Sequence, residues 1–161
     1  MTLTKHELKQ GWKALAIWTV SIAFFIVICV LLYPEMKGEM EGVSDIFASM
    51  GAFTAAFGMD RLNFGTLIGF YSVECGNILG LGGAFFASFV AVGVLAKEEK
   101  ERTAEFLLTH PVSRSRVVSE KLISVLIQLV ILNAIIFALS VASIKGIGEE
   151  IMWKDISLIH L

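Results

Sequence analysis

Three long apolar stretches without Asp, Glu, Lys or Arg dominate the chain. They cover residues 14–33, 77–96 and 122–144. A helix of about 20 apolar residues can cross the roughly 30 Å hydrocarbon core of a membrane. A cleaved signal peptide would instead carry an apolar region of about 7–15 residues, whereas the first stretch is longer and ends at Tyr33-Pro34-Glu35. The pattern predicts an all-α, polytopic membrane protein with three transmembrane helices.

The segments between these stretches also carry helical patterns. Residues 1–13 predict a short interfacial helix, in which Leu8 and Trp12 face lipid while Lys5 and Lys9 stay in water; a frayed basic terminus is the alternative. The 34–76 segment predicts an amphipathic helix, because its apolar residues recur at about helical spacing. These residues are Val43, Ile46, Phe47, Met50, Phe53 and Phe57.

Composition agrees with this fold class. Hydrophobic residues make up 56% of the 161 residues and charged residues 17%, whereas an average soluble domain has about 25% charged residues. Disordered chains have few apolar residues and many charges, so disorder is excluded. The net charge of −2 gives no overall argument for binding nucleic acid.

The distribution of basic residues predicts the orientation. Nine of the 13 Lys and Arg residues lie before the first stretch or between the second and third. Because cytoplasmic segments carry the excess of Lys and Arg, we expect the N-terminus and the 97–121 loop in the cytoplasm. The 34–76 segment and the 145–161 tail then lie outside, in a multi-pass protein of the cell membrane.

Rows of small residues on the second span predict close helix packing. Small side chains at i, i+4 spacing let helix backbones approach closely in lipid. The row consists of Gly76, Gly80, Ala84 and Ser88, with Gly83 and Ala87 beside it. A phosphate-binding loop is the alternative for the glycines, but no Gly-Lys-Ser/Thr follows them.

A few polar residues interrupt or adjoin the spans. Gln128 and Asn133 lie in the third span, and Glu74 precedes the second by a few residues. Polar side chains in lipid usually face other helices or a polar path. These three residues therefore predict either hydrogen bonds between helices or the lining of a transport path.

Catalytic signatures are lacking in the sequence. It has no GxxxxGK[ST] motif for binding ATP and no GxSxG motif. The histidines His6, His110 and His160 are isolated, and no His, Cys or carboxylate group has the spacing of metal ligands. We expect no catalytic, cofactor-binding or metal site in this chain.

The 97–121 loop carries the most specific pattern. It begins with helix-forming, oppositely charged residues such as Glu98 and Arg102 at i, i+4 spacing. Pro111 ends that helix, and Ser113 or Ser115 can cap the next one. An apolar patch at 106–108 lies outside the spans and suits docking into a groove of a partner. A solvated connector is the alternative.

This loop resembles that of permease subunits of type-2 ATP-binding-cassette (ABC) transporters. The resemblance rests on the run from Glu98 to Leu108, followed by Pro111-Val112-Ser113-Arg114 and Glu120-Lys121-Leu122. It implies a coupling helix that docks on a separate ATPase subunit, which binds ATP and magnesium. The residues implied in docking are Glu98, Glu99, Glu101, Arg102, Thr103, Glu105, Phe106, Leu107, Leu108, Pro111 and Arg114.

The resemblance covers the N-terminal half of such a permease, because family members usually have about six spans. A natural half-size subunit, a split gene and a truncation all account for this. We expect an exporter subunit that associates with the ATPase and with a second permease half or copy. A non-transporting scaffold or assembly factor that retains the docking loop is the alternative.

Overall fold

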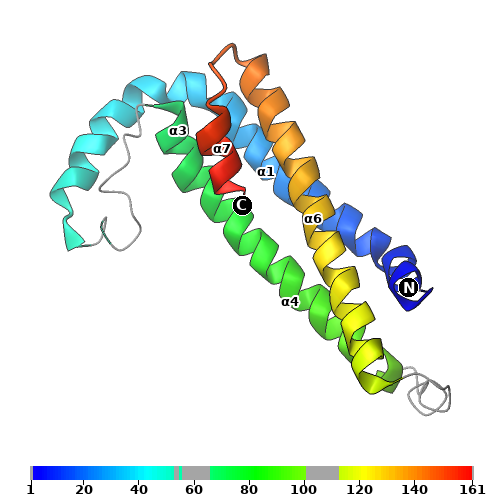
Figure 1. Cartoon of the computed structure of the whole chain (residues 1–161). Helices are drawn as coiled ribbons and strands as arrows, with labels where there is room; N and C mark the ends of the chain where they lie inside the picture. The colour runs from blue at the N-terminus through cyan, green and yellow to red at the C-terminus, as the bar shows by residue number, and fades with distance from the viewer. Residues whose placement is uncertain (1, 53–54, 56–65, 101–112, 161) are drawn as a thin grey trace.

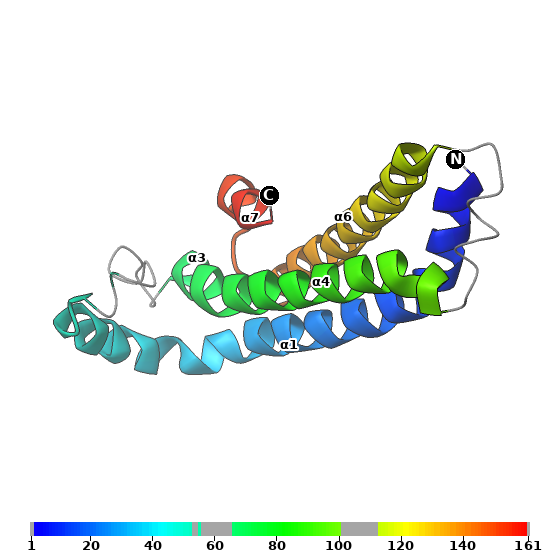
Figure 2. The ribbon, with the colours of Figure 1, turned by 90° about the horizontal axis from the view of Figure 1, so that it is seen from below.

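The computed structural model describes residues 2–52, 55, 66–100 and 113–160. Three long helices form the body of the molecule, and one short helix packs beside them (Figure 1). The long helices are α1 (Thr2–Ser49), α4 (Gly76–Lys100) and α6 (Arg114–Gly146), and the short helix is α7 (Trp153–Ile159). Helices α1 and α6 run in the same direction and α4 runs in the opposite one (Figure 2).

Three helical segments are long and apolar enough to cross a membrane. They are Leu3–Glu39, Leu67–Ala96 and Ser115–Gly146. Large apolar side chains on each face outward: Val20 is 68% exposed, Phe85 66% and Val130 68%. An outward apolar surface on every helix is what contact with lipid tails requires. The predicted all-α class with three spans is confirmed for the described residues.

Helix α1 is much longer than the first predicted span. It continues through Pro34 to Ser49, although Pro34 cannot donate a hydrogen bond to the Val30 carbonyl. A helix of 48 residues is about 70 Å long, so its ends extend well past a hydrocarbon core. Residues of the predicted interfacial helix, of the first span and of the predicted outer helix as far as Ser49 therefore form one helix. Phe53 and Phe57 of the predicted outer helix lie outside the described residues. Its far part projects beyond the other helices (Figures 1 and 2).

The continuous helical segment that contains the second span begins at Leu67, ten residues before the predicted span. Thr66 caps it, with the Oγ1 atom accepting a hydrogen bond of 3.3 Å from the Gly69 N–H. Helix α3 (Leu67–Phe70) leads into a π-helical turn, η2 (Tyr71–Cys75), and then into α4. A π-helical turn inside a longer helix is rare and is often found at functional sites.

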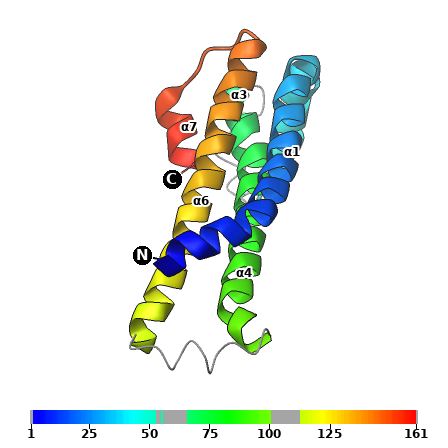
Figure 3. The same cartoon turned by 90° about the vertical axis from the view of Figure 1, so that its right-hand side faces the viewer.

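Helix α6 begins at one of the two predicted caps. The Ser113 Oγ accepts a hydrogen bond of 3.3 Å from the Arg116 N–H, which confirms that prediction. After α6 the chain turns at Gly148, whose φ of +78° favours glycine. The turn directs α7 back alongside the long helices (Figure 3).

The buried core lies where α1 contacts both α4 and α6. Ile26 and Val30 of α1 meet Phe86 of α4 and the pair Leu132 and Ile136 of α6 in one cluster. Trp18 lies above this cluster, with its ring centroid 6.2 Å from that of Phe86. Apolar packing of this kind holds the long helices at fixed positions relative to one another.

Gly82→Ala is expected to weaken the α1–α4 contact. An added Cβ would lie 2.9 Å from two side-chain carbons of Ile22, which is itself buried. Overpacking of this kind costs about 1–3 kcal/mol. Gly80→Ala is the matched control, because a Cβ there meets nothing within 4 Å and the gain in helix propensity is the same. Thermal unfolding in one detergent should give the lower midpoint for Gly82→Ala, and equal midpoints would contradict this packing.

Candidate functional site

Polar side chains join the helices and the segments that adjoin them at the two ends of the bundle and in its buried middle. We call the end that carries Lys100 and Arg114 the loop end, because residues 101–112 connect these helix termini. The other end, which carries Thr66 and Gly146, is the opposite end.

Glu120 of α6 forms hydrogen bonds with the start of α1 at the loop end. Its carboxylate accepts hydrogen bonds from the Leu3 N–H at 3.2 Å and the Arg116 Nε–H at 3.3 Å. The Thr4 hydroxyl donates to the Glu120 backbone carbonyl at 3.1 Å. In Figure 3 the first turns of α1 accordingly lie across α6. Movement of the α6 terminus would therefore carry the α1 terminus with it.

Lys121 joins α6 to α4 at the same end. Its ammonium group is buried and donates a hydrogen bond to the Val94 backbone carbonyl. A buried charge is costly unless it is hydrogen bonded, and the carbonyl oxygen supplies that hydrogen bond. This bond therefore fixes the end of α4 to the beginning of α6, the two helices that residues 101–112 join.

A small cavity lies between the three long helices near the loop end. It has a volume of about 170 Å³ and is lined by Glu7, Gly11 and Gln128, among others. The Gln128 amide is 1% exposed, and neither of its polar atoms has a hydrogen-bond partner in the described structure. Because both atoms are also buried, the amide is an unpaired polar group between α1, α4 and α6 within the described structure.

A second polar group ties the C-terminal helix to the middle of the bundle. The His160 ring lies between two partners: its Nδ1 is 2.7 Å from the Asn133 Oδ1, and its Nε2 is 2.8 Å from the Tyr71 hydroxyl. The Asn133 amide also donates to the His160 backbone carbonyl. All partners are satisfied when Nδ1–H donates to Asn133 and Nε2 accepts from Tyr71. These contacts join α6, η2 and the end of α7.

Comparison with known proteins adds the family. A family model described as "ABC-2 family transporter protein" matches residues 1–161. This chain belongs to the ABC-2 transporter family. No curated protein and no solved structure gives a significant match. It is a multi-pass membrane protein, and the membrane domains of ABC-2 transporters are transmembrane components that generally work with a separate ABC ATPase.

The predicted ABC-2 docking residues fall mostly outside the described structure. Glu98 and Glu99 belong to the last turn of α4, and Arg114 is the first residue of α6. The structure therefore describes the end of α4 and the beginning of α6, which flank residues 101–112. The remaining docking residues lie outside the described residues: Glu101, Arg102, Thr103, Glu105, Phe106, Leu107, Leu108 and Pro111.

The three polar residues considered for a transport path do not meet in one place. Asn133 pairs with His160, whereas Gln128 lines the small cavity near the loop end. Glu74 is exposed on the π-helical turn. Asn133 therefore makes an interhelical hydrogen bond, one of the two alternatives, and a role in a transport path remains a prediction for all three residues.

The predicted small-residue rows of α4 face mainly outward. A Cβ added at Gly80 or Gly83 would meet nothing within 4 Å, and one at Gly76 would lie 3.7 Å from Ile159 of α7. Ala84 and Ser88 are exposed, and Ala87 is half-buried. The close approach of α4 to α1 uses Gly82 instead. Packing of these rows against another polypeptide stays a prediction.

Within the described part of this ABC-2 chain, no group of three or more His, Cys, Asp or Glu side chains could hold a metal ion. The two cysteines, Cys29 and Cys75, are free thiols.

Proposed function

We propose that this chain is a permease subunit of an ABC exporter and that its 98–114 segment docks on a separate ATPase subunit. The segment carries the charged run and the apolar patch at 106–108 in the sequence. The observation that carries the proposal is the family match over residues 1–161. ATP and magnesium would bind the ATPase, and no catalytic residue is assigned to this chain.

The contacts at the loop end support a rigid transfer of motion. A docking segment can pass on the movement of an ATPase only if the helices at its two ends respond together. The Lys121 ammonium on the Val94 carbonyl joins α4 to α6, and Glu120 joins α6 to α1. A displacement of the segment would therefore move three helices as one body, as alternating access requires.

The proposed orientation places the loop end in the cytoplasm, where ATP is available. It follows from the excess of Lys and Arg at the N-terminus and in the 97–121 loop. The opposite end, with α3 and the turn at Gly148, then faces outward. A second permease half or a second copy would complete the transport path, and the outward rows of small residues on α4 offer it a surface.

Purification of the tagged chain from its host's membranes in mild detergent tests this proposal. The expected eluate contains an ABC ATPase subunit, identified by mass spectrometry, together with ATP hydrolysis that vanadate inhibits. A non-transporting scaffold that retains the docking loop would also bind the ATPase. ATP-dependent transport into inverted membrane vesicles is therefore measured as well, because only an exporter subunit supports it. Loss of the ATPase from an intact, monodisperse preparation would contradict the proposal.

A further inference from the structure

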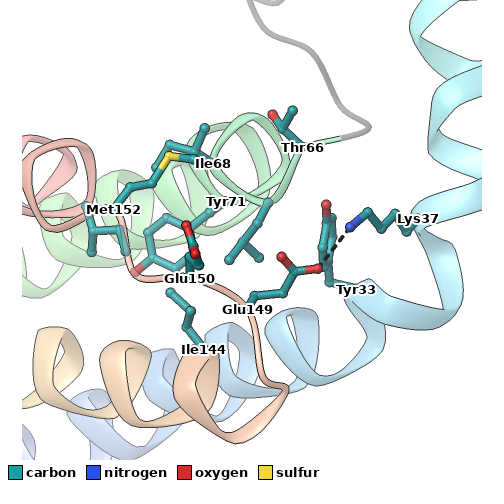
Figure 4. Close-up of a pocket in the computed structure, with 11 residues that line it drawn as sticks. Tyr33, Lys37, Thr66, Ile68, Tyr71, Ile144, Glu149, Glu150 and Met152 are labelled. Carbon is teal, nitrogen blue, oxygen red and sulfur yellow. Dashed lines mark hydrogen bonds and ion pairs between the residues drawn. The ribbon is translucent and has the colours of Figure 1, made fainter.

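A cavity of about 430 Å³ opens at the opposite end, between α1, α3, α6 and the segment before α7 (Figure 4). Its volume lies within the roughly 300–1,000 Å³ of small-molecule sites. Tyr33 and Tyr71 are buried in its floor, and partly exposed Leu67, Ile68 and Met152 form much of its apolar wall. An apolar body of the size of a small organic molecule would be shielded from water here.

The lining of this cavity contains one basic residue and two acidic residues. The Lys37 Nζ lies 3.0 Å from the Glu149 Oε1 and 5.8 Å from the Tyr33 ring centroid, so the one lysine in the lining is neutralised by Glu149. Glu150 also lines the cavity. Within the described part of the chain, its carboxylate takes part in no hydrogen bond or ion pair. The lining therefore carries one uncompensated negative charge.

Figure 4 shows how these groups are distributed. The Lys37–Glu149 pair lies on the side of α1, and Glu150 lies apart from it, among Tyr71, Ile144 and Met152. A ligand that reaches the Glu150 carboxylate would thus lie against apolar side chains rather than against Lys37. Glu150 would repel an anion in this cavity, because the one lysine of the lining is already paired with Glu149. Lys145 lines a neighbouring cavity together with Glu150 and does not line this one.

We propose that this cavity binds an organic cation with an apolar body, and that the cationic centre pairs with the Glu150 carboxylate. The apolar body would be buried against Leu67, Ile68 and Met152, where removal of apolar surface from water favours binding. The attraction to Glu150 selects the sign of the charge and adds modestly to affinity, since this carboxylate is exposed. A soluble amphipathic cation and a lipid with an amine headgroup share this chemistry.

The test compares two ions of the same shape and opposite charge, tetraphenylphosphonium and tetraphenylborate. The purified chain is placed in nanodiscs of phosphatidylglycerol, which has no amine headgroup, and binding to empty nanodiscs is subtracted. We expect saturable binding of tetraphenylphosphonium but not of tetraphenylborate. Equal binding of both ions would overturn the proposal. Competition by added phosphatidylethanolamine would identify a lipid as a source of the cation.

Substitutions of charged residues in the lining test whether tetraphenylphosphonium binds in this cavity. Glu150→Gln should weaken tetraphenylphosphonium binding by about two- to fivefold, whereas Lys37→Met should strengthen it, because Glu149 then becomes a second free carboxylate. Glu35→Gln is the matched control, because Glu35 is exposed on α1 and does not line the cavity. Unchanged affinity in both cavity variants would overturn the proposal. The assay contains no ATP and no partner, so its outcome is independent of coupling to an ATPase.

Discussion

Replacing Phe106, Leu107 and Leu108 with serine is expected to release the ATPase from the purified complex. If these side chains fill a groove in the ATPase, each would contribute about 1.5–3 kcal/mol through burial. A cluster of this kind usually dominates an interface, so retention should fall by more than about tenfold. The ATPase that remains with the tagged chain is measured by immunoblot and by ATP hydrolysis in the eluate.

The control for this variant replaces apolar residues elsewhere on the surface. Ile46 of α1 and Met50, directly after this helix, are 61% and 47% exposed, and they lie beyond the opposite end of the bundle. Their replacement with serine should leave the ATPase bound. If the triple variant reaches the membrane at normal levels and still retains the ATPase, the apolar patch is not the docking surface.

Asn133→Leu is expected to detach α7 from the bundle. The substitution keeps the number and branching of the side-chain heavy atoms but removes the hydrogen bonds to the His160 ring and carbonyl. Two lost hydrogen bonds, with buried groups left unpaired, cost about 2–4 kcal/mol. That cost corresponds to roughly 30- to 1,000-fold faster amide exchange in residues 153–160, if exchange occurs by local opening.

Hydrogen–deuterium exchange with mass spectrometry measures this opening. Asn77→Leu is the matched control, because Asn77 is exposed on α4, and it should leave the exchange of α7 unchanged. Faster exchange in α7 but not in the core of α6 would separate detachment from unfolding. Unchanged protection of α7 in Asn133→Leu would show that apolar contacts such as that of Ile156 hold the helix without this polar group.

The number of spans was readable from the sequence because uninterrupted apolar length is a strong signal. The ends of the helices were not. Helix α1 passes Pro34 and continues into a charged segment, since the hydrogen bonds around one proline suffice to maintain the helix. The helical segment of the second span starts at Leu67, directly after the Thr66 cap and ten residues before the 77–96 stretch that predicts the span. The length of an apolar stretch predicts which residues lie in the membrane, whereas capping residues such as Thr66 mark where a helix begins.

The polar site was predicted in part. The rule that polar side chains in lipid face other helices or a polar path predicts a partner for Asn133, whereas the sequence alone presents His160 as an isolated histidine. Its partners lie 27 and 89 residues away in the sequence, and no local pattern reveals such a pairing. The turn at Gly148 is what brings α7 back to them.

Glycines on α4 illustrate the same limit. Spacing selects Gly80 and Gly83, which lie in rows of small residues, and passes over Gly82, whose neighbours at i±3 and i±4 are the large residues Ile78, Leu79, Phe85 and Phe86. Only the rotation of α4 about its axis decides which one meets α1, and here Gly82 meets Ile22. That rotation follows from the packing of Phe86 and its neighbours on α1 and α6, which depends on contacts distant in sequence.

Photocrosslinking from position 106 tests the central claim most directly. A photoreactive phenylalanine analogue replaces Phe106 in living cells, and the same analogue at Phe85, which is 66% exposed on α4, serves as the control for lipid-facing positions. If the 98–114 segment docks as proposed, irradiation at position 106 links the chain to an ABC ATPase subunit and irradiation at position 85 does not. Efficient crosslinking at position 106 to lipid alone would contradict the account.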